Sequence, residues 1–202
     1  MTDTVAPAAS TTATQPTEER PKPRLKKGLV IVNTGNGKGK TTAAVGLAVR
    51  AAGNKMRVLI VQFIKGKWKT GEQESLKRLA PEIELVRMGK GFTIDRLRDK
   101  RVSMDDHEAA ARAAWDFAVE RVKSGEYAVV VLDEILGTVK AGLVSVDELL
   151  DLVRSKPSKL HLVLTGRNAP PALVEAADLV TEMNPVKHPY AAGIMAQRGV
   201  EF

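Results

Sequence analysis

A glycine-rich segment near the start of the chain constrains its fold more than any other feature. Three glycines alternate with polar and basic residues in "GNGKGKTT", which spans residues 35–42. An apolar, β-branched run precedes this segment, and a helical pattern follows it. Alternating glycines let successive backbone N–H groups point inward at an anion, and the N-terminus of a helix adds partial positive charge. The order of strand, loop and helix therefore predicts a phosphate-binding loop.

The spacing of this loop departs from the usual Walker A pattern, G-x-x-x-x-G-K-[ST]. That pattern requires glycine at position 34, but the chain has Thr34 there and its first glycine is Gly35. The loop is thus one residue shorter than usual. We expect Lys40 to neutralise phosphate oxygens and the hydroxyl of Thr41 to bind Mg²⁺. A glycine-rich turn without a ligand is the alternative interpretation.

Six short apolar runs follow one another along the chain, separated by longer polar segments. Continuous apolar and β-branched runs are typical of parallel strands that are covered on both faces. Their alternation with helical patterns predicts an α/β, doubly wound, mainly parallel sheet flanked by helices, with ligands at the carboxyl ends of the strands. The expected strands are residues 28–34, 57–63, 83–88, 127–134, 161–166 and 178–183.

Three helices have clear sequence signals. One is expected over residues 40–52 and stops at Gly53, a residue that commonly ends helices. A second, rich in alanine, is expected over residues 105–123. Ser145 and Glu148 have the spacing of a capping box, which predicts that a third helix begins directly after Ser145.

The first 27 residues differ in composition from the rest of the chain. They are rich in Thr, Ala and Pro and contain few large apolar side chains, so they cannot bury enough surface to offset the entropy of ordering. We therefore expect a disordered tail over residues 1–27 and a single folded domain over residues 28–202. A transit peptide is the less favoured alternative. The basic end of the tail, "RPKPRLKK", is either a solvated linker or a segment that folds over an anionic ligand.

A second motif supports the phosphate loop. The run "YAVVVLDE" consists of aliphatic residues followed by Asp133 and Glu134, which is the Walker B form. At the end of a strand, these acids can meet a metal ion bound to Thr41. We expect Asp133 or Glu134 to complete a magnesium shell, and the sequence leaves open which of them contacts the ion.

Net charge and composition limit the classes of partner and of site that the chain can have. The formal net charge is +7 and the sequence pI is about 9.7, which favours an anionic partner without identifying it. The chain has no cysteine, so a disulfide framework and a thiolate metal site are excluded. No apolar run is long enough to span a bilayer. We expect a cytoplasmic protein with no membrane contact.

Several motifs together resemble the ATP:corrinoid adenosyltransferase family. They are "GNGKGKTTAA", "VQFIKGKW", "GE", "GFT", "VVLDEIL", "LTGRNAP", "ADLVTEM", "KHPY" and "AQRGVEF", and they extend from about residue 27 to residue 202. The resemblance implies that Co(I) of a reduced corrinoid attacks C5′ of ATP, forming a cobalt–carbon bond and expelling triphosphate. It also implies a P-loop, RecA-like fold and a nucleotide that lies reversed in the loop, in keeping with the unusual spacing.

The resemblance assigns residues on the nucleotide side of the site. Thr41 and Glu134 match the positions that bind magnesium in the family. Arg50 and Arg167 resemble arginines that contact nucleotide or phosphate, and we count Lys40 and Arg167 among the catalytic residues. The residues expected to bind ATP are Gly35, Asn36, Gly37, Lys38, Gly39, Lys40, Thr41, Thr42 and Arg50.

The resemblance implies that the segment "MGKGFTIDR", residues 88–96, contacts the corrinoid. Phe92 matches an aromatic residue that presses against the lower face of the corrinoid, which makes it the third expected catalytic residue. Ile94 stands where well-known members have tryptophan, so the apolar wall is kept with less aromatic area. Trp68 is either a second contact or an ordinary packed tryptophan. Among the histidines we expect His107 to be exposed, and only His188, in "KHPY", suggests a functional role.

Partners and alternatives complete the hypothesis. The resemblance implies a homodimer and a reduced flavoprotein as electron donor. The strongest alternative is an ATPase or kinase that uses the same loop and acids at the γ-phosphate. A nucleotide-dependent nucleic-acid binder ranks below it, because aromatic residues make up only 4% of the chain and no basic stripe is interleaved with them.

Overall fold

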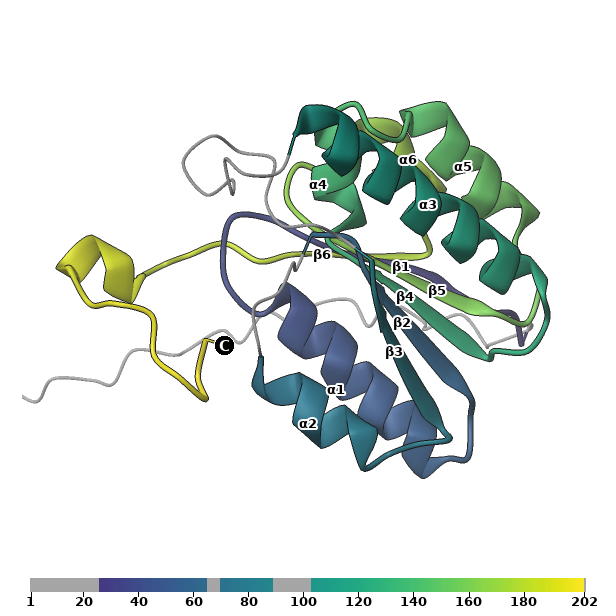
Figure 1. The fold of residues 1–202 in the computed structure, drawn as a ribbon, viewed down its shortest axis with the longest axis horizontal. Coiled ribbons are helices and arrows are strands. Elements are labelled where there is room, and N and C mark those ends of the chain that lie inside the picture. Colours follow the sequence, from purple (N-terminus) through teal and green to yellow (C-terminus); the bar gives the residue numbers. More distant parts are fainter. Residues whose placement is uncertain (1–25, 65–69, 89–102, 202) are drawn as a thin grey trace, which may run out of the picture.

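A six-stranded, all-parallel β-sheet forms the centre of the molecule (Figure 1). The computed structural model describes residues 26–64, 70–88 and 103–201. The strand order is β3-β2-β4-β5-β1-β6, and every adjacent pair is parallel. The strands are β1 (Val30–Thr34), β2 (Val58–Gln62), β3 (Ile83–Arg87), β4 (Val129–Asp133), β5 (His161–Thr165) and β6 (Leu179–Glu182).

Helices cover both faces of this sheet (Figure 1). Two of them, α1 (Lys40–Gly53) and α2 (Gly71–Lys77), lie on one face. The opposite face carries α3 (Met104–Lys123), α4 (Ile135–Lys140), α5 (Val146–Ser155) and α6 (Pro171–Ala176). A short 3₁₀ helix, Pro189–Ala192, follows β6.

Alternation along each strand divides the core into two layers. In β2, Leu59 and Val61 belong to the cluster beneath α3 and α5, whereas Val58 and Ile60 pack with the alanines of α1. Burial of both sets explains why the four inner strands, β1, β2, β4 and β5, are mainly apolar. The doubly wound α/β fold expected from the sequence is confirmed.

The expected elements agree with the structure to within a few residues. All six strands form, and the capping box is present: the Ser145 hydroxyl accepts from the Glu148 N–H while the Glu148 carboxylate accepts from the Ser145 N–H. The short helices α2, α4 and α6 were not anticipated. The division at residue 27 stays a prediction, because residues 1–25 lie outside the described part of the chain.

The order of the strands creates a crevice at their carboxyl ends. The chain leaves β1 toward the face that carries α1, whereas it leaves β4 and β5 toward the opposite face. Ligands of doubly wound sheets bind where the connections diverge in this way. β5 lies between β1 and β4, so the glycine-rich loop and the Walker B acids are one strand apart.

Candidate active site

The glycine-rich loop joins β1 to α1 in a conformation that depends on glycine. Gly35 and Gly39 have φ angles of +96° and +109°, in the left-handed region that glycine adopts at little cost. Gly39 is the N-cap of α1, and no side chain caps this end of the helix. The first N–H groups of α1 therefore add their partial positive charge at the loop, as an anion site requires.

Lys40 is folded over the loop rather than extended into solvent. Its Nζ donates to the carbonyl oxygens of Gly35 and Gly37, at 2.8 and 2.6 Å, and the residue is 8% exposed. Burial lowers the pKa of Lys40 from its usual value; the charge of Glu134 opposes this shift and that of Arg167 adds to it. The negative charge of Glu134 thus favours the protonated form of the Lys40 ammonium group, and the positive charge of Arg167 disfavours it.

A backbone segment that follows β6 forms the outer wall of the loop. The Gly37 N–H donates to the Met183 carbonyl oxygen at 2.5 Å, and the Met183 N–H donates to that of Thr34 at 2.8 Å. A Cβ atom on Gly35 or Gly37 would lie 2.5 or 2.6 Å from the same Met183 oxygen. Both positions therefore exclude a side chain because two backbones meet there. Farther along, Glu201 pairs with Lys38 at 2.8 Å.

The carboxylate of Asp133 is held by donors from three elements. It is 1% exposed at the end of β4. Its Oδ1 accepts from the hydroxyls of Thr41 in α1 and Thr165 in β5, both at 2.8 Å. Its Oδ2 accepts from Nε2 of Gln62 in β2 at 3.1 Å. These three donors offset the cost of burying the polar oxygens of the side chain.

Glu134 takes an unusual backbone conformation beside it. Its φ angle is +64°, which for a residue with a side chain costs of order 1–3 kcal/mol. The Glu134 N–H donates to the Thr165 hydroxyl at 2.8 Å, and its carbonyl accepts from Gly137 as α4 begins. The strand therefore ends abruptly and the chain turns into α4 at the edge of the crevice.

Most of the expected nucleotide residues gather at one place. The loop, Thr41, Asp133 and Glu134 surround Lys40, and Arg167 follows β5 in an exposed turn. Arg50 does not join them, because it lies in the last turn of α1, about 15 Å along the helix axis from Lys40 at 1.5 Å per residue. The structure gives Arg50 no contact with the loop.

Four residues at the site were not singled out from the sequence: Gln62, Thr165, Met183 and Glu201. Gln62 and Thr165 each end an otherwise apolar run with a polar side chain. That signal was present, but its meaning depends on the strand order, which places β5 between β1 and β4. The contacts of Met183 and Glu201 have no local signal, because their partners lie far away in the chain.

Other expectations fall outside this cluster. Phe92, Ile94 and Trp68 lie outside the described residues. The expectation that His107 is exposed is wrong: it is 4% exposed, on the inner face of α3. His188 Nδ1 accepts from the Tyr190 N–H and so caps the 3₁₀ helix.

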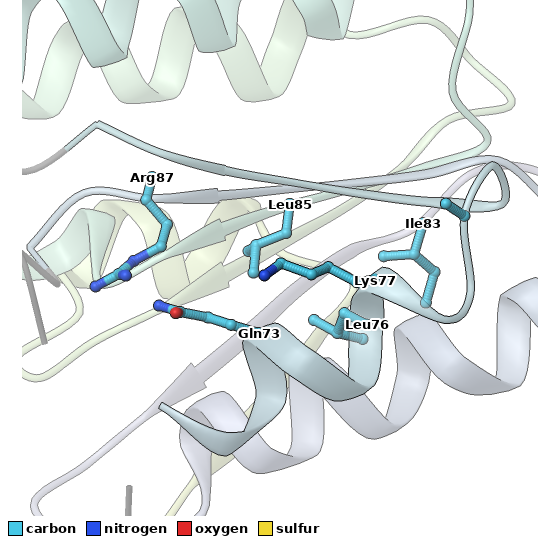
Figure 2. A pocket seen from close by; sticks show the side chains of 7 residues that line it. Gln73, Leu76, Lys77, Ile83, Leu85 and Arg87 are labelled. Atoms are coloured by element: carbon cyan, nitrogen blue, oxygen red, sulfur yellow. The ribbon is translucent and has the colours of Figure 1, made fainter. Parts of the chain in front are cut away.

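A cavity of about 300 Å³ lies between α2 and the edge strand β3, away from the loop. Figure 2 shows Gln73 of α2 and Arg87 of β3 extending toward one another at one end of the cavity, with Leu76 and Ile83 at the other end. Three strands separate β3 from β1. The cavity is therefore not part of the cluster around Lys40.

Among residues 26–64, 70–88 and 103–201, no group of three or more His, Asp or Glu side chains could hold a metal ion by itself. Over the same ranges, every helix is too short or too polar to cross a bilayer.

Comparisons with known proteins agree on one family. A family model described as ATP:corrinoid adenosyltransferase BtuR/CobO/CobP matches residues 26–202. A corrinoid adenosyltransferase of Pseudomonas aeruginosa is 43% identical over 182 residues, covering 89% of this chain and 86% of the relative. Those of Escherichia coli K12 and Salmonella typhimurium are 37% and 36% identical over 177 residues, covering 88% of this chain and 87% of each relative.

A comparison with solved structures gave a partial match to a protein of low sequence identity. The matching structure is that of the flagellar accessory protein FlaH from Methanocaldococcus jannaschii, with a TM-score of 0.49 and 14% sequence identity. The match covers 77% of this chain and 70% of that one.

Proposed function

The chain belongs to the ATP:corrinoid adenosyltransferase family, and we propose that the cluster around Lys40 is the site at which it binds ATP and expels triphosphate. The enzyme is an ATP-dependent transferase that adenosylates corrinoids. The observation that carries the site assignment is the position of Lys40 over the loop, beside a Thr41 hydroxyl bonded to Asp133 at 2.8 Å.

The reaction determines what the protein groups must do. An electron pair on Co(I) forms a bond to C5′ of ATP, the bond from C5′ to oxygen breaks, and that electron pair leaves on triphosphate. Negative charge therefore grows on the oxygen next to the α-phosphorus. Lys40 and the N–H groups at the start of α1 stabilise that charge, and Arg167 adds a further cation. No side chain has to act as the nucleophile.

The residues at the end of β4 fit a magnesium ion. Mg²⁺ in nucleotide sites usually takes one or two carboxylates or hydroxyls together with phosphate oxygens and water. Thr41, Asp133 and Glu134 supply oxygen ligands of that kind in the proposed site, and the ion would neutralise charge on the leaving triphosphate.

The orientation of the nucleotide also forms part of the proposal. In this short loop the Gly37 N–H is already bonded to Met183, so it is not directed at an anion. In an ordinary phosphate loop the backbone N–H groups point at the phosphates. Because the Gly37 N–H of this loop is bonded to Met183 instead, the loop binds phosphate differently, which supports a triphosphate that lies reversed relative to ordinary P-loop enzymes. C5′ is then open to the corrinoid.

Further partners follow from the family alone. Phe92 is proposed to press on the lower face of the corrinoid, and a reduced flavoprotein to supply the electron. A cytoplasmic homodimer is the proposed state. Light scattering of the purified protein tests the dimer.

One experiment tests the central proposal. The protein is incubated without oxygen with Mg-ATP and chemically reduced cobalamin, the corrin spectrum is followed, and triphosphate and orthophosphate are both assayed. We expect adenosylcobalamin and triphosphate in equal amounts. Orthophosphate without a cobalt–carbon product would instead identify an ordinary NTPase, the alternative that the family relationship does not favour.

A further inference from the structure

A single hydroxyl, that of Thr165, joins the two Walker B acids, and Asp133 in turn accepts from Thr41 at the start of α1. Thr165 ends β5, is 0% exposed and lies between the ends of β1 and β4. Its Oγ1 donates to Asp133 Oδ1 and accepts from the Glu134 N–H, both at 2.8 Å. A hydroxyl has one hydrogen to donate, so the bond to Asp133 uses it and fixes how the group is rotated.

The bond to Asp133 fixes the first acid. Oδ1 receives both Thr165 and Thr41, while Gln62 holds Oδ2 from the other side. With both oxygens bonded, the carboxylate cannot turn about its own axis without breaking a buried hydrogen bond. Thr41 is thereby held at a set distance from the end of β4.

The bond to the Glu134 N–H fixes the second acid. Glu134 has a left-handed backbone, which its surroundings must maintain. The Thr165 hydroxyl accepts from the Glu134 N–H, and the Glu134 carbonyl accepts from the N–H groups of Gly137 and Thr138 in the first turn of α4. The direction in which the Glu134 side chain leaves the backbone depends on this turn.

We infer that Thr165 is a positioning residue for the reaction: it sets the relative placement of Asp133, Glu134 and Thr41, and with it the affinity for the divalent cation that accompanies ATP. The inference rests on the proposed metal site. Outer partners of metal ligands typically change metal affinity by tenfold to a hundredfold when they are removed, so the effect is large enough to measure.

The test compares Thr165→Val, which keeps the shape and removes the hydroxyl, with Thr165→Ser, which keeps the hydroxyl. Thr138→Val is the matched control, because Thr138 is also a buried threonine, 2% exposed, on the adjacent helix α4. Binding of Mn²⁺ in the presence of ATP is measured by electron paramagnetic resonance, and binding of ATP is measured in Mg²⁺ and in EDTA.

We expect Thr165→Val to weaken ATP-dependent Mn²⁺ binding by about tenfold or more, and Thr165→Ser and Thr138→Val to bind nearly as the parent protein does. ATP affinity in EDTA should be equal in all four proteins, which shows that the loop is intact. Parent-like Mn²⁺ binding by Thr165→Val, or a Ser variant as weak as the Val variant, overturns the inference. If the parent protein itself binds no Mn²⁺ with ATP, the proposed metal site is wrong and the inference fails with it.

Discussion

The hydroxyl of Thr41, in the first turn of α1, donates to the buried carboxylate of Asp133 at 2.8 Å, although 92 positions separate the two residues. The bond ties the phosphate loop to the end of β4 across the strand that lies between them. A hydrogen bond to a charged, buried acceptor contributes more than one between neutral groups. The relationship therefore serves both the fold and the proposed site.

The two Walker B acids should respond differently to loss of charge. Asp133→Asn places an amide where three donors converge, so we expect the free energy of unfolding to fall by about 1–3 kcal/mol and transfer to be lost. Glu134→Gln, at a half-buried position, should change stability by about 0.5 kcal/mol or less while slowing metal-dependent turnover. Urea unfolding and initial rates separate the two effects, and equal stability losses would contradict this difference.

Lys40→Ala should reduce adenosyl transfer by about a hundredfold or more, because it removes the cation that lies over the loop. The rate of adenosylcobalamin formation measures the effect. Lys159→Ala, an exposed position outside the site, is the control for loss of one positive charge. Near-normal turnover in Lys40→Ala would count against the loop assignment.

Alkaline pH should inactivate the enzyme earlier than an ordinary lysine predicts. Because burial lowers the pKa of Lys40 below 10.5, the free enzyme loses this charge at a lower pH than usual. The alkaline limb of kcat/KM for ATP reports that group and should have its midpoint below 10.5. The effect on folding has the opposite direction. The unfolded chain binds this proton more tightly than the folded protein does, so the contribution of Lys40 to the free energy of unfolding increases as the pH rises. A midpoint at or above 10.5 would refute the prediction.

Gly37→Ala should separate the loop from its outer wall. The new Cβ would lie 2.6 Å from the Met183 carbonyl oxygen, so either backbone must move, at a cost of about 1–3 kcal/mol. We expect weaker ATP binding by calorimetry and a lower unfolding midpoint. Gly46→Ala in α1 is the control: nothing lies within 4 Å, and it should stabilise the helix by about 0.5–1 kcal/mol.

Phe92→Ala tests the corrinoid side, which rests on the family resemblance and lies outside the described residues. If Phe92 displaces the lower ligand before reduction, its loss should slow the reaction from cob(II)alamin with a reductant more than the reaction from cob(I)alamin prepared beforehand. Parallel rate measurements from the two oxidation states decide this. Equal losses would remove the proposed role.

The sequence was most informative where structure is local. Six apolar runs, a glycine loop and a Ser-Glu capping pair each predict their element from a few neighbouring residues, and all of them are present. Strand order is not local, so the junction of Gln62 and Thr165 on Asp133 was not predicted. Gly37 illustrates a second limit. The sequence explains glycine at this position by the close approach of a phosphate, whereas the structure shows that the backbone of Met183 also leaves no room for a side chain.

The contact between the loop and Met183 joins residues that are synthesised at very different times. Translation delivers residues 35–39 early, but the carbonyl that binds Gly37 and the carboxylate that pairs with Lys38, 163 positions later, are made near the end of the described chain. A nascent chain therefore carries the glycines on the ribosome without the surface that shapes them. Nucleotide affinity should accordingly appear late in synthesis, after β6 has joined β1.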